Sequence, residues 1–207
     1  MKLCETFLSV QGEGIMIGEV THFVRTSGCN LRCVWCDTSY SYEGGDDISV
    51  SEIIELTKED RNVCVTGGEP LLQEDIYDLL DALLKEGKRT VLETNGSIDI
   101  SKVPVHEDMI ISMDIKCPSS GMNDRMKFTN IKYLKRTDQL KFVISDDKDL
   151  AYAESFIKTN ELKCNIIFTP AGGMDMKPLA KKVMERRLNV RVLPQLHKII
   201  WGDRRSV

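Results

Sequence analysis

The chain has 207 residues, of which 42% are hydrophobic and 29% charged, and its formal net charge is −4. This length and balance predict a globular protein with room for one full hydrophobic core, and we expect a single domain over residues 1–207. The acidic charge and the lack of a long basic run argue against nucleic acid as a partner. No apolar run approaches the roughly 20 residues of a membrane span, so no membrane partner is expected either.

Cysteine usage indicates the compartment. Seven cysteines are an odd number, and the first residues lead straight into a strand-like segment that carries Glu5, without a signal peptide. A disulfide framework is therefore not expected, and a reducing, cytoplasmic setting is favoured. Four cysteines lie in or beside strand-like stretches, and we interpret them as small buried hydrophobic side chains: Cys4, Cys64, Cys117 and Cys164.

Strand-like runs alternate with segments of helical periodicity along the chain. The expected strands span residues 5–10, 22–26, 62–65, 90–93, 109–113, 139–144, 165–168 and 189–193. The expected helices span residues 51–58, 72–84, 130–136, 150–159 and 176–188. Ser49 and Glu52 have the spacing of a capping box at the start of the first helix.

This alternation predicts parallel β/α units. About six core strands are too few for the closed eight-stranded barrel. We therefore expect the α/β class, as an incomplete, TIM-like barrel of about six parallel strands with the helices outside.

Polar or glycine-rich motifs recur where the expected strands end. They are the cysteine loop after Thr26, Thr66–Pro70, Thr94–Gly96, Asp114–Lys116, Thr169–Pro170 and Gln195–His197. Any one of these motifs suits a turn. In parallel β/α architectures, however, the active site gathers at the carboxyl ends of the strands. Six such motifs at one edge therefore predict an active site there.

Three cysteines, Cys29, Cys33 and Cys36, have the spacing C-x-x-x-C-x-x-C, and no fourth cysteine or histidine follows at finger-like spacing. A structural zinc site takes four protein ligands, whereas iron–sulfur clusters are held by thiolates. Three thiolates can hold a four-iron cube and leave one iron open for a ligand. The pattern favours a reaction centre, and the alternative is a zinc loop completed by a distant cysteine.

The segment Cys29–Cys36, with the sequence CNLRCVWC, resembles the cluster motif of the radical S-adenosylmethionine (SAM) superfamily. Thr66–Pro70, with the sequence TGGEP, resembles the glycine-rich SAM motif of that superfamily, and its two glycines allow a close approach of backbone to ligand. The resemblance implies a radical SAM core, with a [4Fe-4S] cluster on the three cysteines. It also implies SAM on the open iron, where an electron cleaves it to a 5′-deoxyadenosyl radical.

A narrower resemblance covers nearly the whole chain. It rests on Ser9–Gly14 (SVQGEG), Phe23–Gly28, Cys36–Thr38, Lys116–Met122, Leu140–Val143, Gln195–Lys198 and Ile200–Gly202. These motifs are similar to those of the 7-carboxy-7-deazaguanine synthase family. The resemblance implies conversion of 6-carboxy-5,6,7,8-tetrahydropterin to 7-carboxy-7-deazaguanine with loss of ammonia, a step towards deazapurines such as queuosine.

The same resemblance implies site residues, matched motif by motif. The substrate contacts would come from Val10, Gln11, Gly12, Glu13, Arg25 and Thr66. The SAM contacts would come from Trp35, Cys36, Asp37, Gly68, Glu69, Gly96, Asp114, Lys116, Gln195 and His197. Arg25 would meet the substrate carboxylate, which suits its planar guanidinium. Thr38 would give its hydroxyl to a Mg²⁺ ion that also binds substrate oxygens. No catalytic side chain is assigned beyond the cluster and SAM.

One motif departs from the family pattern. Many members read Ser-Pro-Lys where this chain has Asp114, Ile115 and Lys116, so a negative charge is added beside the lysine. Elsewhere, His22 and His106 have no companions in the sequence, and we interpret both as structural or exposed.

Other functions stay open at this point. A radical SAM enzyme that installs a glycyl radical on another protein shares the cysteine spacing, but has no need of the Gln11–Gly14 loop before it. A zinc-stabilised interaction module is the alternative from another class. A tRNA-binding role is suggested by the pathway alone and opposed by the net charge. The expected partners are the pterin, a reductant such as flavodoxin or ferredoxin, and a second copy in a homodimer, because an open barrel has edges to cover.

Overall fold

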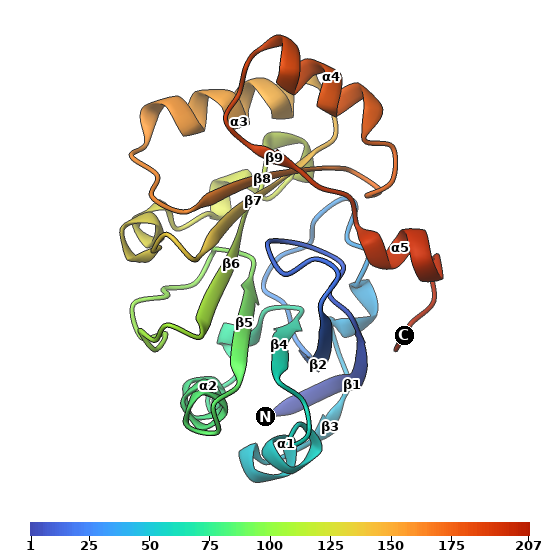
Figure 1. Ribbon diagram of the computed structural model, residues 1–207, viewed down its shortest axis with the longest axis vertical. Helices are drawn as coiled ribbons and strands as arrows, with labels where there is room; N and C mark the ends of the chain where they lie inside the picture. The colour runs from blue at the N-terminus through green and yellow to red at the C-terminus, as the bar shows by residue number, and fades with distance from the viewer.

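All strands belong to one sheet in the computed structural model, which describes residues 1–207 (Figure 1). The strands are β1 (Lys2–Val10), β2 (Val20–Thr26), β3 (Asp46–Asp47), β4 (Asn62–Gly67), β5 (Arg89–Thr94), β6 (Met109–Ile115), β7 (Gln139–Ile144), β8 (Asn165–Pro170) and β9 (Arg191–Val192). Their order is β3-β1-β2-β4-β5-β6-β7-β8-β9, and no pairing joins the two ends. The sheet is therefore not closed.

Strand direction divides this sheet into two parts. From β2 to β9 every neighbouring pair is parallel, whereas β1 runs antiparallel to both β2 and β3. Six of the parallel strands have six or seven residues, and β9 has two. The expected α/β class and incomplete parallel barrel are confirmed, and the antiparallel β1 is an addition.

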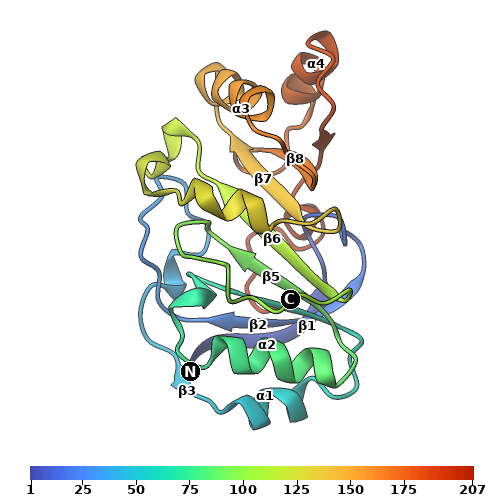
Figure 2. The same ribbon diagram turned by 90° about the vertical axis from the view of Figure 1, so that its left-hand side faces the viewer.

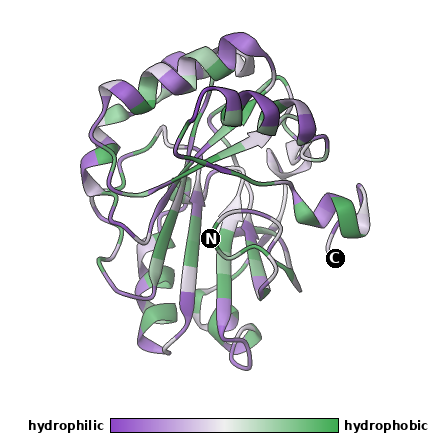
Figure 3. Ribbon diagram, turned by 45° about the horizontal axis from the view of Figure 1, so that its top comes forward, coloured by the Kyte–Doolittle hydropathy of each residue, from purple (hydrophilic) through white to green (hydrophobic).

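Four helices lie on the outside of this curved sheet: α1 (Val50–Leu56), α2 (Ile76–Lys85), α3 (Asp147–Thr159) and α4 (Lys177–Glu185). The fifth, α5 (Leu196–Trp201), follows β9 and lies apart from them. In Figure 2, α2 runs along the outside of the sheet beside β5, and α3 lies against β7. Figure 3 shows both purple and green along the outer helices, which is the pattern of helices with one buried and one solvated side.

The core has an outer and an inner layer because successive strand residues point to opposite faces. On β4, Val63 and Val65 belong to the large cluster under the helices, whereas Cys64 between them belongs to a small inner cluster. The inner cluster consists of Met16, Phe23, Cys64, Val91 and Ile110. It closes the inside of the open barrel below the carboxyl ends of the strands.

No helix is both long and apolar enough to cross a membrane.

One local prediction is confirmed, and two predicted helices differ from the structure. The capping box is present, because Ser49 accepts from the Glu52 amide and Glu52 accepts from the Ser49 amide. The helix expected over 72–84 begins only at Ile76, after a short 3-10 segment, η2 (Pro70–Leu72). The helix expected over 130–136 is present as a 3-10 helix, η5 (Phe128–Tyr133), so its type and bounds were not predicted. The side-chain amide of the buried Asn130 donates to the carbonyls of Gly96 and Ile98.

The chain end also differs from expectation. The last strand is limited to Arg191–Val192, and α5 follows it, where the sequence predicted only a polar strand end. Both edges of the sheet, β3 and β9, are strands of two residues. Such short edges leave few unpaired backbone groups, so exposed edges give little support to dimerisation.

Candidate active site

A cavity of about 330 Å³ opens at the carboxyl ends of the parallel strands. Inward-facing side chains of four strands meet in its wall because the strands are in register. Arg25 on β2 is level with Thr66 on β4, and Asp114 on β6 is level with Lys141 on β7. The end of the sheet at which the sequence predicted a site therefore holds a real cavity.

The cavity brings together nearly all of the residues that the sequence singled out. Its lining includes Val10, Gln11, Gly12, Glu13, Arg25, Cys29, Cys33, Trp35, Cys36, Asp37, Thr38, Thr66, Gly68, Asp114, Lys116, Gln195 and His197. Two of the expected residues, Glu69 and Gly96, do not line it. Segments that lie far apart in the sequence thus form one wall.

The cysteine loop is held in place by its other residues. Leu31 is buried, and its amide donates to the Cys29 sulfur at 3.4 Å. The Val34 amide donates to the Ser120 carbonyl at 3.1 Å in η3 (Pro118–Ser120). The Arg32 guanidinium donates to the Cys29 carbonyl at 2.7 Å and also lies over the Tyr42 ring, 4.2 Å from its centroid. The polar loop residues therefore fix the loop around the thiols.

The glycine-rich turn packs directly against this loop. A Cβ at Gly68 would lie 2.2 Å from the Gly28 oxygen and 2.7 Å from the Cys29 Cβ. The next residue, Glu69, donates its amide to the same Gly28 oxygen at 2.8 Å. Only glycine allows this contact, so the turn and the cysteine loop form one continuous surface.

The three thiols suit a cluster better than a single ion. All seven cysteines are free, and no three His, Cys, Asp or Glu side chains are placed to hold one metal ion. Cys29, Cys33 and Cys36 instead line the open cavity. Burial raises the pKa of the Cys33 thiol, and nearby Lys116 acts against that rise. Three thiols around an open space fit a multi-atom iron–sulfur group with one side facing the cavity.

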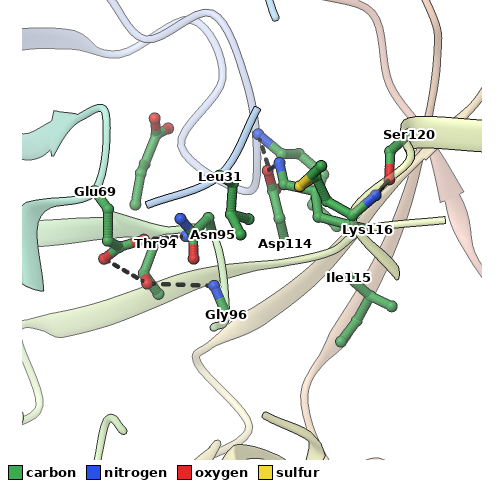
Figure 4. Close-up of polar contacts among 12 residues, drawn as sticks. Leu31, Glu69, Thr94, Asn95, Gly96, Asp114, Ile115, Lys116 and Ser120 are labelled. Atoms are coloured by element: carbon green, nitrogen blue, oxygen red, sulfur yellow. Dashed lines mark hydrogen bonds and ion pairs between the residues drawn. The ribbon is translucent and has the colours of Figure 1, made fainter. Parts of the chain in front are cut away.

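Glu69 does not line the cavity but supports its wall through contacts with Thr94 and Asn95 (Figure 4). Its carboxylate is fully buried and accepts hydrogen bonds from the Asn95 amide at 2.7 Å, the Thr94 hydroxyl at 2.9 Å and the Leu71 amide at 3.1 Å. These bonds tie the end of β4 to the end of β5. Burial raises the pKa of Glu69 to about 7, although these three bonds oppose the rise. Gly96 also lies behind the wall, where a Cβ would be 2.6 Å from the backbone carbonyl oxygen of Asp114.

We expect Glu69 to make stability depend on pH. Its pKa is raised from 4.5 to about 7 in the folded state. The folded protein therefore gains its full stabilisation from neutral Glu69 below pH 4.5, and this stabilisation is lost as the pH rises through 7. The shift corresponds to about 3 kcal/mol of unfolding free energy. Glu69→Gln should remove this pH dependence. Urea unfolding at pH 5, 6, 7 and 8 measures it, with the exposed Glu86→Gln as the control. An unchanged slope in Glu69→Gln would contradict the assignment.

A row of alternating charges crosses the cavity floor. Lys141 forms an ion pair with Glu13, and its Nζ is 3.3 Å from Asp114 Oδ1, while Lys116 Nζ is 2.5 Å from Asp114 Oδ2. All four side chains are largely buried. Burial would raise the pKa of Asp114, but Lys116 and Lys141 together lower it. The added negative charge of Asp114 is thus balanced by two lysines within the site.

The sequence motifs included Lys141 but gave it no role, and they left out Glu93. Lys141 contacts acids on both sides, and Glu93 accepts from the Thr66 hydroxyl at 3.0 Å. Burial raises the pKa of Glu93, and Lys141 opposes that rise. A signal was available, since a charged residue inside an otherwise apolar parallel strand is rarely buried without a partner.

Helix α5 closes the cavity from the far end of the chain. Gln195 Nε2 donates to Glu13 at 2.6 Å and to Asp37 at 3.1 Å, and Lys198 Nζ is 3.2 Å from Asp37. The His197 ring packs so closely on Gly12 that a Cβ there would lie 2.0 Å from Nδ1. Burial would raise the pKa of Asp37, but Lys198 holds it well below its usual range. The end of the chain thereby clamps the Gln11–Gly14 loop.

His22 has companions that the sequence did not predict. Its Nδ1 is 2.7 Å from Asp60 Oδ2, and its Nε2 is 2.7 Å from the Thr6 hydroxyl. His22 does not line the cavity. The structural interpretation of His22 is retained, but the statement that it stands alone was wrong.

An open parallel barrel with three thiols at the carboxyl ends of its strands defines the class of radical SAM proteins. In agreement, the family model described as the Radical SAM superfamily matches residues 23–137. The solved structure of QueE from Escherichia coli has a TM-score of 0.72 at 23% identity and covers 92% of both chains. Streptococcus suis SuiB bound to S-adenosylmethionine has a TM-score of 0.60 at 14% identity, over 81% of this chain and 48% of that chain.

Sequence relatives identify the family within the class of radical SAM proteins. The 7-carboxy-7-deazaguanine synthase of Thermoplasma acidophilum is 42% identical over 205 residues, which are 98% of each chain. The 7-carboxy-7-deazaguanine synthase of Methanospirillum hungatei JF-1 is 44% identical over 206 residues, which are 97% of this chain and 85% of the relative. The chain therefore belongs to the 7-carboxy-7-deazaguanine synthase family of radical SAM enzymes.

Proposed function

We propose that this protein converts 6-carboxy-5,6,7,8-tetrahydropterin to 7-carboxy-7-deazaguanine with loss of ammonia. The observation that carries the proposal is that the Val10–Glu13 loop and the cysteine loop line one cavity. Family membership supports the reaction, because the relatives are named for this product. We assign residues 1–207 to one radical SAM domain, in agreement with the single sheet.

The cofactors follow from the family and from the thiols. Cys29, Cys33 and Cys36 would hold a [4Fe-4S] cluster with SAM beside it, and these groups would supply the 5′-deoxyadenosyl radical. The surrounding cavity lining would hold SAM through Trp35, Asp37, Gly68, Asp114, Lys116, Gln195 and His197. Glu69 and Gly96 would act on SAM only indirectly, by fixing the strand ends behind the wall.

The substrate site would lie between the Val10–Glu13 loop, Arg25 and Thr66. Arg25 presents a guanidinium for the substrate carboxylate, and Thr66 presents a hydroxyl already bonded to Glu93.

Thr38 would contribute a hydroxyl to Mg²⁺. It lines the cavity, and its hydroxyl donates to Asp37 at 2.9 Å. A single hydroxyl makes a weak site, and Mg²⁺ prefers several oxygens and waters. The substrate carboxylate would therefore have to complete the site.

The test is an anaerobic assay of the reconstituted enzyme with SAM, a chemical reductant and the carboxypterin. We expect 5′-deoxyadenosine, ammonia and 7-carboxy-7-deazaguanine to form together, and to decrease when Mg²⁺ is removed. Colourless protein with zinc in place of iron would favour the interaction module instead. Cleavage of SAM that leaves the pterin unchanged would favour an activase.

The remaining partners in the proposal are an electron donor and a second copy of the chain. We expect an electron donor such as flavodoxin or ferredoxin, because the cluster must be reduced. A homodimer is consistent with the apolar outer face of the β1–β2 pair, where Leu8 and Val20 are more than half exposed. Light scattering of the purified protein tests this. A cytoplasmic setting agrees with the free cysteines.

A further inference from the structure

Glu5 forms the wall of the cavity beside Arg25, although the site motifs gave it no role. The two residues are level on the antiparallel pair β1–β2, and Glu5 Oε1 accepts from Arg25 Nε at 2.7 Å. The side chains are 9% and 16% exposed, respectively, so this is a largely desolvated ion pair. Both residues line the cavity.

Arg25 is held by only one of its edges. Its Nε is bonded to Glu5, while its terminal nitrogens, Nη1 and Nη2, have no hydrogen-bond acceptor in the protein. Those nitrogens are not among the fully buried unpaired atoms, so they remain accessible from the cavity. A guanidinium whose Nε edge is fixed presents its Nη edge in one direction, which suits a planar carboxylate.

Glu5 is itself fixed from three directions. The Tyr40 hydroxyl donates to Oε1 at 2.9 Å, and the Ser206 hydroxyl donates to Oε2 at 2.6 Å. Tyr40 is in turn covered by the Arg205 guanidinium, 3.6 Å from its ring centroid. Burial alone would raise the pKa of Glu5, but the bonds from Ser206, Tyr40 and Arg25 lower it below its usual value. Glu5 is therefore an ionised, immobile acceptor.

The negative charge of Glu5 makes binding of the substrate carboxylate less favourable. Its negative charge offsets the positive charge of Arg25 and so weakens the attraction of that arginine for a second carboxylate. Charge alone therefore gives no reason for Glu5, whereas orientation does. We propose that Glu5 is a positioning residue, which holds Arg25 so that its Nη edge aligns the substrate carboxylate for reaction.

The inference rests on the proposed function, and kinetics of the reconstituted enzyme test it. In Glu5→Ala, Arg25 loses its anchor, so we expect the KM for the carboxypterin to rise by about tenfold or more. We also expect more 5′-deoxyadenosine per product than in the wild type, because a misaligned substrate lets SAM be cleaved without turnover. Glu5→Gln keeps one acceptor oxygen and should restore part of both values. Tyr40→Phe, which removes one donor, should shift both values less.

A second Glu–Arg pair offers a matched control. Glu19 accepts from Arg89 at 3.0 and 3.1 Å, and neither residue lines this cavity. Glu19→Ala should therefore leave the KM and the product ratio unchanged. The iron content and the thermal midpoint of each variant show whether it folds. If Glu5→Ala does not fold, the two single variants Glu5→Gln and Tyr40→Phe carry the test.

The outcomes separate the two proposals. Wild-type values in both Glu5 variants would overturn the positioning role while leaving the reaction intact. A wild-type enzyme that leaves the carboxypterin unchanged would overturn the proposed function, and the inference with it. A shift confined to the Glu5 and Tyr40 variants, with partial rescue by glutamine, supports the inference.

Discussion

Replacing Cys33 with alanine is expected to remove bound iron and SAM cleavage together. Cys33 lines the same cavity as Cys29 and Cys36, and it is one of the three thiols that would hold the cluster. Two remaining thiolates cannot hold a four-iron cube that needs one thiolate at each of three irons. Iron and sulfide analysis after anaerobic reconstitution measures the first loss. The yield of 5′-deoxyadenosine measures the second.

Cys164→Ala is the matched control for this experiment. Cys164 is a half-buried free thiol that packs against the outer core and does not line the cavity. This variant should keep the iron content of the wild type and its activity. Wild-type iron and turnover in Cys33→Ala would refute the three-thiol site, and with it the radical mechanism.

Replacing Lys141 with methionine is expected to cost the largest amount of stability. Lys141 is the only cation paired with Glu13, and it also shares Asp114 with Lys116. Removing one partner of a buried ion pair leaves an uncompensated charge, at a cost of about 3–5 kcal/mol in unfolding free energy. Urea unfolding measures this cost.

The pH dependence of that cost follows from Glu13. Burial would raise the pKa of Glu13, but Lys141 lowers it below its usual value. The ion pair therefore contributes its full stability above the pKa that Glu13 has in the unfolded chain. This contribution is lost as the pH falls through the lower pKa of Glu13 in the folded protein. The cost of Lys141→Met should therefore be larger at pH 8 than at pH 4. Lys158→Met, which breaks an exposed pair with Glu154, should change stability little at either pH. Equal effects of the two variants would refute the buried network.

Local sequence signals predicted the elements well where local physics decides them. The capping box at Ser49 places the start of α1, because both of its bonds lie within four residues. Strand 139–144 agrees with β7 at both ends, since its apolar run is bounded by polar residues. The type and bounds of η5 and the presence of α5 were not predicted, because Asn130 is bonded to the loop after β5 and α5 rests on the Gln11–Gly14 loop. Those partners lie far away in the sequence.

The candidate site divides in the same way. Cys29, Cys33 and Cys36, the glycines of the Thr66–Pro70 turn and the resemblance of the motifs are properties of short segments, so the amino-acid sequence alone suffices to recognise the family. That Glu69 lies behind the cavity wall could not be recognised in this way, because two of its donors, Thr94 and Asn95, come from the end of β5, which is distant in the sequence. His22 likewise gains Asp60 only when β2 pairs with β4, because Asp60 lies just before the start of β4.

The sequence by itself determined the family of this protein, the cysteine loop for which a cluster is proposed, and the carboxyl ends of the strands as the place of the cavity. Only the tertiary structure decided which charges meet there. Lys141 finds Glu13, and Arg25 finds Glu5, because strand register brings inward-facing residues together across the sheet. The cost of burying a charge depends on its neighbours in space, and these are set by packing rather than by spacing along the chain.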